Sequence, residues 1–567
     1  MFFVDLKILL ISVICFGYLY ADDEEITIEI PDGKIKGKAL TTINNTPFYS
    51  FQGIPYAQPP IDELRFQAPV PVEPWDDVVD ATYEKNICYQ VPNDYDKESE
   101  DCLFVNVFTP TEPSSEAGLP VMFFIYGGGF VEGSSEEINY GPHHFMDYGV
   151  ILVTFNYRVG PFGFFSTGDD AIPGNAGLKD QTLALQWVQK NIEYFGGDPS
   201  KVTIFGESAG GASVGYQILS PLSKGLFRAA IAESGSPLSA WAFQRNQIQI
   251  TYQTAGYINP DIANASSSEL LEYLLSLPAK DIDDASHTQA SNENVQYQQI
   301  QQGFYYAPIV EHEHEGAFIT EKMLEILRKG DFNKVPLLIG FNSEESYFYA
   351  DSADNLAYLS SEFDKNTSLL VPHDMHIAQE STREFAARDI NQFYVGDSTF
   401  AEDTLKIVSY FSDQSFVRSI IKHATIQSAF TNVYFYKFSY SGVIAGYVQE
   451  SVEGFSGIVR HGEELSYIFR RNYEGLNNTD ITKFPEQDQT VFKRFITFFT
   501  NFAKTLNPTP DEDKLLENII WPKVNVTDFA YLDIGSYSEV KFHPREPNYH
   551  EWEAIYYKYG VPPYDTY

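Results

Sequence analysis

The chain has 567 residues, of which 43% are hydrophobic, so it can bury a large core. Its 78 acidic and 38 basic residues give a formal net charge of −40, which argues against nucleic acid and anionic membranes as partners. We expect a soluble protein suited to an extracellular fluid.

The N-terminus has the pattern of a secretory signal. An apolar run over residues 8–20 ends at the small residue Ala21, and acidic residues follow at once. The run is short for a membrane span and is cut off by negative charge, so we expect cleavage near residue 21. An uncleaved anchor is the alternative, because Asp5 offsets the charge of Lys7. The expected organisation is a signal at residues 1–21 and one secreted domain at residues 22–567, with no membrane anchor.

The cysteines fit an oxidising compartment. Of three cysteines, Cys15 lies within the expected signal. The remaining pair, Cys88 and Cys102, closes a loop of about fifteen residues, which favours a disulfide. The chain also has five N-x-[ST] sequons, so we expect glycosylation at some of them. These sequons begin at Asn44, Asn264, Asn366, Asn477 and Asn525.

In chain order, short apolar strands alternate with amphipathic helices. The predicted elements are strands at 121–125 and 151–155, a helix between 180 and 195, a strand at 202–205, a helix over 211–219, strands at 337–339 and 433–438, and a late helix with Val491, Phe495, Phe498 and Phe502 on one face. This alternation predicts an α/β fold with a large, mostly parallel, doubly wound sheet flanked by helices. Ligands of such sheets bind beyond the carboxyl ends of the strands, and the polar stretch 261–302 is expected as an insertion over that end.

The run Gly206-Glu207-Ser208-Ala209-Gly210 connects the predicted strand at 202–205 to the helix after it. The pattern G-x-S-x-G between a strand and a helix is typical of a nucleophile elbow, with the serine at the apex of a sharp turn. The glycines leave room for the crossing chain, and the helix N-terminus favours negative charge nearby. The alternative is an ordinary serine on a glycine-rich turn.

A nucleophilic serine needs a base to accept its proton and a carboxylate to orient that base. His461 lies in a glycine-punctuated loop after the strand at 433–438, and it best fits the chain order serine, acid, histidine. The alternatives are His373, His376 and His423. The acid is expected in the loop after 337–339, where the residues alone do not separate Glu344 from Glu345.

The run Tyr126-Gly127-Gly128-Gly129-Phe130 directly follows the strand at 121–125. Glycines there can present bare N–H groups to a tetrahedral oxygen, and the N–H of Ala209 can supply another donor. A triple glycine alone is weak evidence. Its place at a strand end, upstream of the elbow, predicts an oxyanion hole.

The pair His312 and His314 could share one face of a strand and bind a metal. No third ligand stands at a telling spacing, so a solvated charged turn is the better interpretation. We expect no metal and no other cofactor.

Several longer runs carry a resemblance over nearly the whole mature chain. They are residues 51–57 (FQGIPYA), 99–103 (SEDCL), 126–130 (YGGGF), 156–160 (NYRVG), 174–181 (GNAGLKDQ) and 195–211. Together they resemble the type-B carboxylesterases of the carboxylesterase/cholinesterase family. The resemblance implies the α/β-hydrolase fold, ester hydrolysis without a cofactor, and a small-molecule ester as the partner.

The resemblance also assigns roles to single residues. It makes Glu345 the acid and His461 the base of Ser208, and it makes Gly128, Gly129 and Ala209 the oxyanion donors. Cys88–Cys102 matches the family's first disulfide, and Arg65 with Glu100 matches its buried ion pair beside that loop. Ser234 matches a serine next to the catalytic residues. Glu207, Trp241 and Tyr126 are expected beside the substrate; Glu207 either tunes the electrostatics of the pocket or caps the helix.

Departures from the family pattern narrow the function. The loop from Tyr89 to Asp101 contains Tyr95 but lacks the tryptophan with which a cholinesterase stacks choline, so acetylcholine is not expected as a substrate. Ser346 stands where the family usually has glycine. Insect juvenile hormone esterases usually carry glutamine where Glu207 stands.

We therefore expect a secreted serine carboxylic ester hydrolase that acts on small to medium esters through an acyl-enzyme. A juvenile hormone, pheromone or odorant esterase is the alternative. A non-catalytic, cholinesterase-like adhesion protein is the alternative of another class. The sequence does not indicate the oligomeric state.

Overall fold

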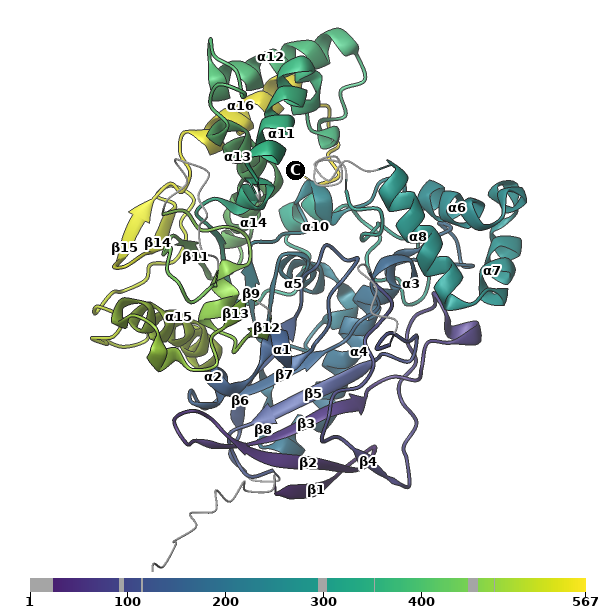
Figure 1. The fold of residues 1–567 in the computed structure, drawn as a ribbon, viewed down its shortest axis with the longest axis vertical. Helices are drawn as coiled ribbons and strands as arrows, with labels where there is room; N and C mark the ends of the chain where they lie inside the picture. The colour runs from purple at the N-terminus through teal and green to yellow at the C-terminus, as the bar shows by residue number, and fades with distance from the viewer. Residues whose placement is uncertain are drawn as a thin grey trace, which may run out of the picture.

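The computed structural model describes residues 24–90, 96–113, 116–293, 303–350, 352–446, 457–473 and 475–566. The expected signal with Cys15, the residue Tyr95 and the end of the expected insertion, 294–302, lie outside these residues. Within them the chain folds around a 13-stranded sheet (Figure 1), in the order β1-β2-β3-β5-β7-β6-β8-β9-β10-β11-β14-β15 with β4 paired to β2.

The strands of this sheet fall into a parallel centre and antiparallel edges. The strands from β7 through β14 in that order pair in parallel, whereas β1, β2, β3 and β5 on one side and β15 on the other pair antiparallel. Their bounds are β1 Glu25–Ile30, β2 Gly33–Thr41, β3 Pro47–Pro55, β4 Val78–Asp80, β5 Phe104–Thr109, β6 Leu119–Ile125, β7 Ile151–Phe155, β8 Gly197–Glu207, β9 Ala229–Glu233, β10 Leu337–Asn342, β11 Val433–Phe438, β14 Ala530–Ile534 and β15 Ser538–Phe542; a separate ribbon pairs β12 Asn472–Tyr473 with β13 Leu476–Asn477.

Helices flank the sheet, as predicted. Helix α5 packs on β8 and β9, and α15 packs on β6 and β8. The bounds are α1 Glu137–Tyr140, α2 His143–Met146, α3 Gly160–Phe164, α4 Ala176–Asn191, α5 Ala209–Leu219, α6 Gln247–Ile258, α7 Ser267–Ser276, α8 Ala279–Glu293, α10 Met323–Lys329, α11 Ala353–Lys365, α12 Glu380–Val395, α13 Leu405–Ser412, α14 Arg418–Ser428, α15 Glu486–Thr505 and α16 Asn548–Tyr559. Among the described residues, no helix is both long and apolar enough to cross a bilayer.

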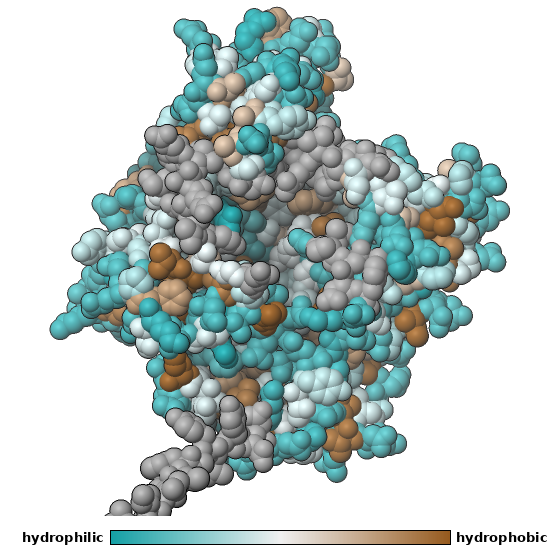
Figure 2. Space-filling view, viewed as in Figure 1, coloured by the Kyte–Doolittle hydropathy of each residue, from teal (hydrophilic) through white to brown (hydrophobic). Residues whose placement is uncertain are grey.

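Two groups of helices stand apart from the sheet (Figure 1). One contains α6, α7 and α8, and the other contains α11, α12, α13 and α16. The first group includes the expected insertion, whose described part contains the whole of α7 and α8. The face seen in Figure 2 is mostly hydrophilic, with hydrophobic side chains scattered over it. Such a surface agrees with the large negative charge of the sequence.

The predicted strands agree with β6, β7, β8, β10 and β11, because each is a continuous apolar run that the structure buries. The sequence prediction did not include strands β1–β5 or the central strand β9. The sequence of β9, Ala-Ala-Ile-Ala-Glu, has one β-branched residue, Ile231, and no aromatic residue, so its strand signal is weak. Its residues are small because α5 packs directly on it.

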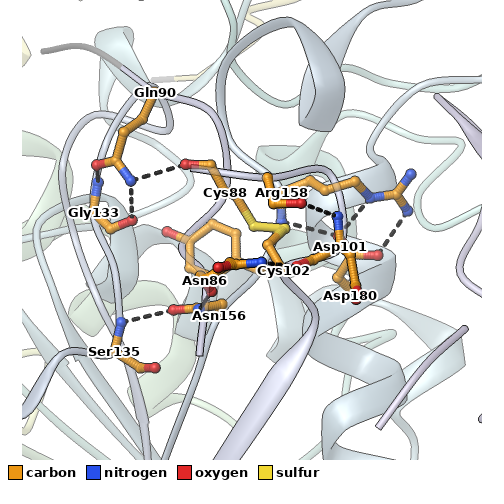
Figure 3. The surroundings of a disulfide bond; sticks show 12 residues. Asn86, Cys88, Gln90, Asp101, Cys102, Gly133, Ser135, Asn156, Arg158 and Asp180 are labelled. Atoms are coloured by element: carbon orange, nitrogen blue, oxygen red, sulfur yellow. Dashed lines mark hydrogen bonds and ion pairs between the residues drawn. A yellow bond between two sulfur atoms is a disulfide. The ribbon is translucent and has the colours of Figure 1, made fainter. Parts of the chain in front are cut away.

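Cys88 and Cys102 form the predicted disulfide (Figure 3). Gln90, two residues from Cys88, donates from Nε2 to the carbonyl of Gly133 at 3.1 Å and accepts from the Gly133 N–H at 2.7 Å. Asn156 accepts from the N–H of Ser135 at 2.8 Å and donates to the carbonyl of Asn86 at 3.0 Å. The start of the disulfide loop is therefore tied to the segment that follows the glycine run at 127–129.

A largely buried ion pair lies beside this loop, where the resemblance implies one. Arg65 binds both carboxylate oxygens of Glu100 at 2.6 Å. Its Nη1 also donates to the carbonyls of Leu274 and Leu277 at 2.9 and 2.8 Å, at the carboxyl end of α7. One guanidinium thus connects the disulfide loop to the helix group that contains α7.

The disulfide closes a loop with a sequence separation of 14, so its loss should lower the free energy of unfolding. For a double variant with Cys88→Ser and Cys102→Ser, we expect a loss of about 3 kcal/mol in the free energy of unfolding. The reason is that the cross-link no longer restricts the conformations of the unfolded chain. Urea unfolding measures the change. Reduction of the native protein should give a matching loss and should leave the double variant unaffected; equal unfolding midpoints for the native and double-variant proteins would contradict the prediction.

Candidate active site

A cavity of about 390 Å³ opens beyond the carboxyl ends of the central strands. We call it the central cavity. It is lined by segments that follow β6, β8, β9, β10 and β11, which is where the sequence predicts a ligand site. The lining residues are Gly128, Gly129, Val131, Glu132, Tyr140, Glu207, Ser208, Trp241, Phe304, Phe348, Phe416, His461, Gly462, Leu465 and Arg471.

Ser208 stands at the corner between β8 and α5 with φ 59° and ψ −123°, a backbone conformation that is strained for a non-glycine residue. A Cβ on Gly206 would lie 2.5 Å from the carbonyl oxygen of Ile125, and one on Gly210 would collide with the same oxygen. The corner is held by the Ser208 N–H, which donates to the carbonyl of Glu233 at 2.9 Å. The strand, turn and helix therefore have the geometry expected of a nucleophile elbow.

His461 lies in the loop after β11 and contacts a fully buried carboxylate. Its Nδ1 is 2.6 Å from Oε2 of Glu345, and its backbone N–H donates to the Glu345 carbonyl at 3.1 Å. The other oxygen of Glu345 accepts from the Ser234 hydroxyl and from the Asn342 N–H, each at 2.6 Å. Three hydrogen bonds thus compensate the burial of this carboxylate.

Glu344 points elsewhere. Arg545 binds its two carboxylate oxygens at 3.0 and 2.7 Å. The two acids that the residues alone left equivalent therefore have different partners. Glu345 contacts the imidazole, and Glu344 belongs to an ion pair with Arg545.

The second ring nitrogen of His461 faces another acid. Its Nε2 lies 3.1 Å from Oε1 of Glu207. Burial lowers the pKa of His461, but the charge of Glu207 and the hydrogen bond and charge of Glu345 outweigh it and raise this pKa to about 9. No hydrogen bond joins Ser208 to His461 among the described residues, although both line the central cavity. The cap residue of α5 is Ser208, whose side chain makes no capping hydrogen bond, and the observed contact of Glu207 is with the imidazole of His461.

Two further buried acids complete this group, and the sequence prediction did not include them. Burial and the charges of Glu207 and Glu345 raise the pKa of Glu464 to about 8. Burial and the charge of Glu464 raise the pKa of Glu233 well above its usual range. Glu233 directly precedes Ser234 and Glu464 lies three residues after His461, but acidic residues are too common in this chain to stand out.

The glycine run packs against the corner. A Cβ on Gly127 would lie 2.9 Å from the Cβ of Ser208, so this close approach requires glycine. Gly128 and Gly129 take positive φ values of 98° and 60°, and both line the central cavity. Within the described residues, no acceptor binds their N–H groups or that of Ala209, the first residue of α5. These donors remain available for an oxyanion.

Aromatic rings form one wall of the central cavity. Trp241 lies against Phe304 with ring centroids 6.0 Å apart and against Phe416 at 5.6 Å. Tyr126 does not belong to this wall, and the expectation for it is corrected. It stacks on Tyr157 at 4.3 Å beneath the cavity, and its hydroxyl donates to the Tyr157 carbonyl, because the side chain turns into the core where β6 ends.

The other histidines lie outside the central cavity. His423 is buried against Ser236 and Gln427, and His376 pairs with Asp565. Burial lowers the pKa of His373 to about 4. His312 and His314 stack at 4.7 Å and bind Asp170 and Glu311. Throughout the described ranges, no group of three or more histidine, cysteine and acidic side chains has a metal-binding arrangement.

Comparison with known proteins agrees with this arrangement. The profile of the carboxylesterase family matches residues 23–552. Juvenile hormone esterase of Tribolium castaneum is 32% identical over 518 residues, covering 87% of this chain and 85% of the relative. Venom carboxylesterase-6 of Apis mellifera is 31% identical over 560 residues, covering 95% and 96%.

A solved structure extends the comparison to three dimensions. The crystal structure of juvenile hormone esterase from Manduca sexta, with OTFP covalently attached, superposes with a TM-score of 0.81 at 29% identity. The match covers 94% of this chain and 100% of that one. The chain thus belongs to the carboxylesterase family and is a serine carboxylic ester hydrolase with the α/β-hydrolase fold.

Proposed function

We propose that this chain is a secreted carboxylesterase that hydrolyses small to medium esters through an acyl-enzyme on Ser208. One observation carries the proposal. The strained corner at Ser208, the His461–Glu345 pair and the unpaired N–H groups of the glycine run all surround one cavity.

In the acylation step, Ser208 Oγ attacks the ester carbonyl while His461 Nε2 takes the hydroxyl proton. The N–H groups of Gly128, Gly129 and Ala209 bind the negative oxygen of the tetrahedral intermediate. His461 then gives its proton to the leaving alcohol. In deacylation, His461 takes a proton from water, the hydroxide attacks the acyl carbon, and Ser208 recovers the proton.

Glu345 holds the imidazole in one tautomer and balances the charge of the imidazolium. Glu207 acts on the same ring from the other nitrogen. Because it raises the pKa of His461, it favours the protonated base in the free enzyme and stabilises the imidazolium that forms during attack. No metal or cofactor enters these steps.

The proposal includes the cellular context. Residues 1–21 are removed, and residues 22–567 act as one secreted domain. The disulfide supports an oxidising compartment. The five sequon asparagines, Asn44, Asn264, Asn366, Asn477 and Asn525, are all exposed, which supports glycosylation at some of them.

The size of the central cavity supports the substrate class. Ligand pockets of about 300–1,000 Å³ bind drug-sized molecules, and this one is near the lower end at about 390 Å³. The wall of Trp241, Phe304 and Phe416 favours an apolar group on one side of the ester. Glu132, Glu207 and Arg471 make the rest of the cavity polar.

The triad is tested by labelling with an organophosphate and by turnover of p-nitrophenyl acetate. Ser208→Ala should abolish both. Glu345→Gln should lower kcat by at least about 100-fold, because the amide orients the wrong tautomer. Glu344→Gln is the matched control, and it should keep most of kcat. Labelling at another residue, or a larger loss in Glu344→Gln than in Glu345→Gln, would contradict the assignment.

A juvenile hormone or pheromone esterase is the second candidate, because two of the relatives named above are juvenile hormone esterases. Glu207 favours the general esterase. The measurement is kcat/KM for juvenile hormone beside kcat/KM for acetate and butyrate esters. We expect the short esters to be hydrolysed at least as efficiently, and a strong preference for the hormone reverses the ranking.

The pH dependence follows from the raised pKa of His461. Only neutral His461 can accept the serine proton, so kcat/KM should rise with pH, reach half of its maximum near pH 9 and level off above that pH. Glu207→Gln removes a charge that raises this pKa, so the rise should move to lower pH by about one unit or more. Glu132→Gln, in the same cavity but without a contact to His461, should leave it in place. An unmoved profile in Glu207→Gln would refute the electrostatic role.

A further inference from the structure

One continuous helix beside the central cavity changes its winding. Helix α13 ends at Ser412, α14 begins at Arg418, and residues Asp413–Val417 between them form a π-helical segment. Such a segment adds a residue to a turn, and each helical residue turns the chain by about 100°. The side chains of the segment therefore point where a regular α-helix would not place them.

The π-helical segment directs two groups at the candidate site. The ring of Phe416 lies 4.7 Å from the ring of His461 with an interplanar angle of 47°, and Phe416 is 3% exposed. The carbonyl of Ser415 accepts a hydrogen bond from Trp241 Nε1 at 2.9 Å. The same turn thus contacts the imidazole and fixes the aromatic wall.

Polar contacts anchor the π-helical segment to the loop that carries the acid. Asp413 accepts from Arg545 Nε at 2.7 Å and from the Tyr394 hydroxyl at 2.8 Å. Arg545 also binds Glu344, the neighbour of Glu345. Ser412, just before the segment, accepts from the Ser346 N–H at 2.9 Å. The segment and the Glu345 loop are therefore held together on both sides of the acid.

We propose that the π-helical segment is a positioning element of the active site and that Phe416 is the positioning residue that acts through His461. The inference rests on the proposed role of His461 as the base. The hydrogen bond from Nδ1 to Glu345 fixes one atom of the ring, but rotation about that bond would still move Nε2. The tilted ring of Phe416 restricts this rotation, and its π electrons favour the imidazolium.

The extra residue is what brings an aromatic ring to this position. Without it, the turn would shift by one residue, and the small Ser415 or the aliphatic Val417 would face His461. Neither offers an aromatic face. The geometry of the helix and the identity of Phe416 therefore act together.

The test compares Phe416→Leu with Phe411→Leu. Phe411 is a fully buried ring of α13 that packs on Phe363 at 5.3 Å. For Phe416→Leu we expect kcat to fall about 10-fold with KM changed less than about twofold, because the base is misoriented. The rise of kcat/KM should move to lower pH by a few tenths of a unit, because the imidazolium loses the ring face. Phe411→Leu should lower the thermal midpoint comparably, with kcat and the pH profile unchanged. Phe416→Tyr should recover most of kcat.

Two results would overturn the inference. One is native kcat and an unmoved pH profile in Phe416→Leu. The other is a change confined to KM or to acyl-length preference, which would make Phe416 a wall of the pocket only. If Phe416→Leu does not fold, Ser412→Ala is the variant to test, with an expected two- to fivefold loss of kcat at constant KM. An unchanged kcat in Ser412→Ala would also overturn the inference. Failure of the proposed function is separate, since it would appear as turnover that survives Ser208→Ala.

Discussion

The site depends on burying one carboxylate with enough hydrogen-bond donors around it. Glu345 has no exposed surface, and burying a lone ionised carboxyl is strongly unfavourable. The Ser234 hydroxyl, the Asn342 N–H and the His461 ring offset that cost with three short hydrogen bonds. Each donor comes from a different element, the segment after β9, the end of β10 and the loop after β11. The order of the parallel strands therefore brings these donors together around the acid.

The order of the strands also explains how much of the fold and of the site could be predicted from the sequence. The strand before Ser208, the glycines around it and the helix after it form a local pattern. This pattern by itself predicts the sharp turn at Ser208. Two other predictions were correct because they also rest on simple features of the sequence. The count of cysteines predicted the pairing of Cys88 with Cys102, and the alternation of strands and helices predicted the mostly parallel sheet. The strand β9 was not predicted, because its alanines serve the packing of α5 and carry no strand signal.

Contacts between distant segments could not be derived from local patterns. The residues around Glu344 and Glu345 are alike, and their partners from distant segments separate them: Arg545 binds Glu344, and His461 binds Glu345. The winding of Asp413–Val417 has no sequence signature, since π-helical turns depend on what the surrounding structure supports. Tyr126 was misplaced because a residue at the end of a strand can face the cavity or the core, and packing on Tyr157 decides.

The bond network of Arg65 has a consequence for how such an enzyme can change. The guanidinium binds backbone carbonyls of Leu274 and Leu277, so it does not depend on which side chains α7 carries. Phe304, which follows the same insertion, contributes directly to the cavity wall. Substitutions in the helix group of α6, α7 and α8 can therefore reshape the aromatic wall of the central cavity while the attachment of that group to the disulfide loop persists. Substitutions can in this way change the range of substrates without weakening the attachment that Arg65 provides.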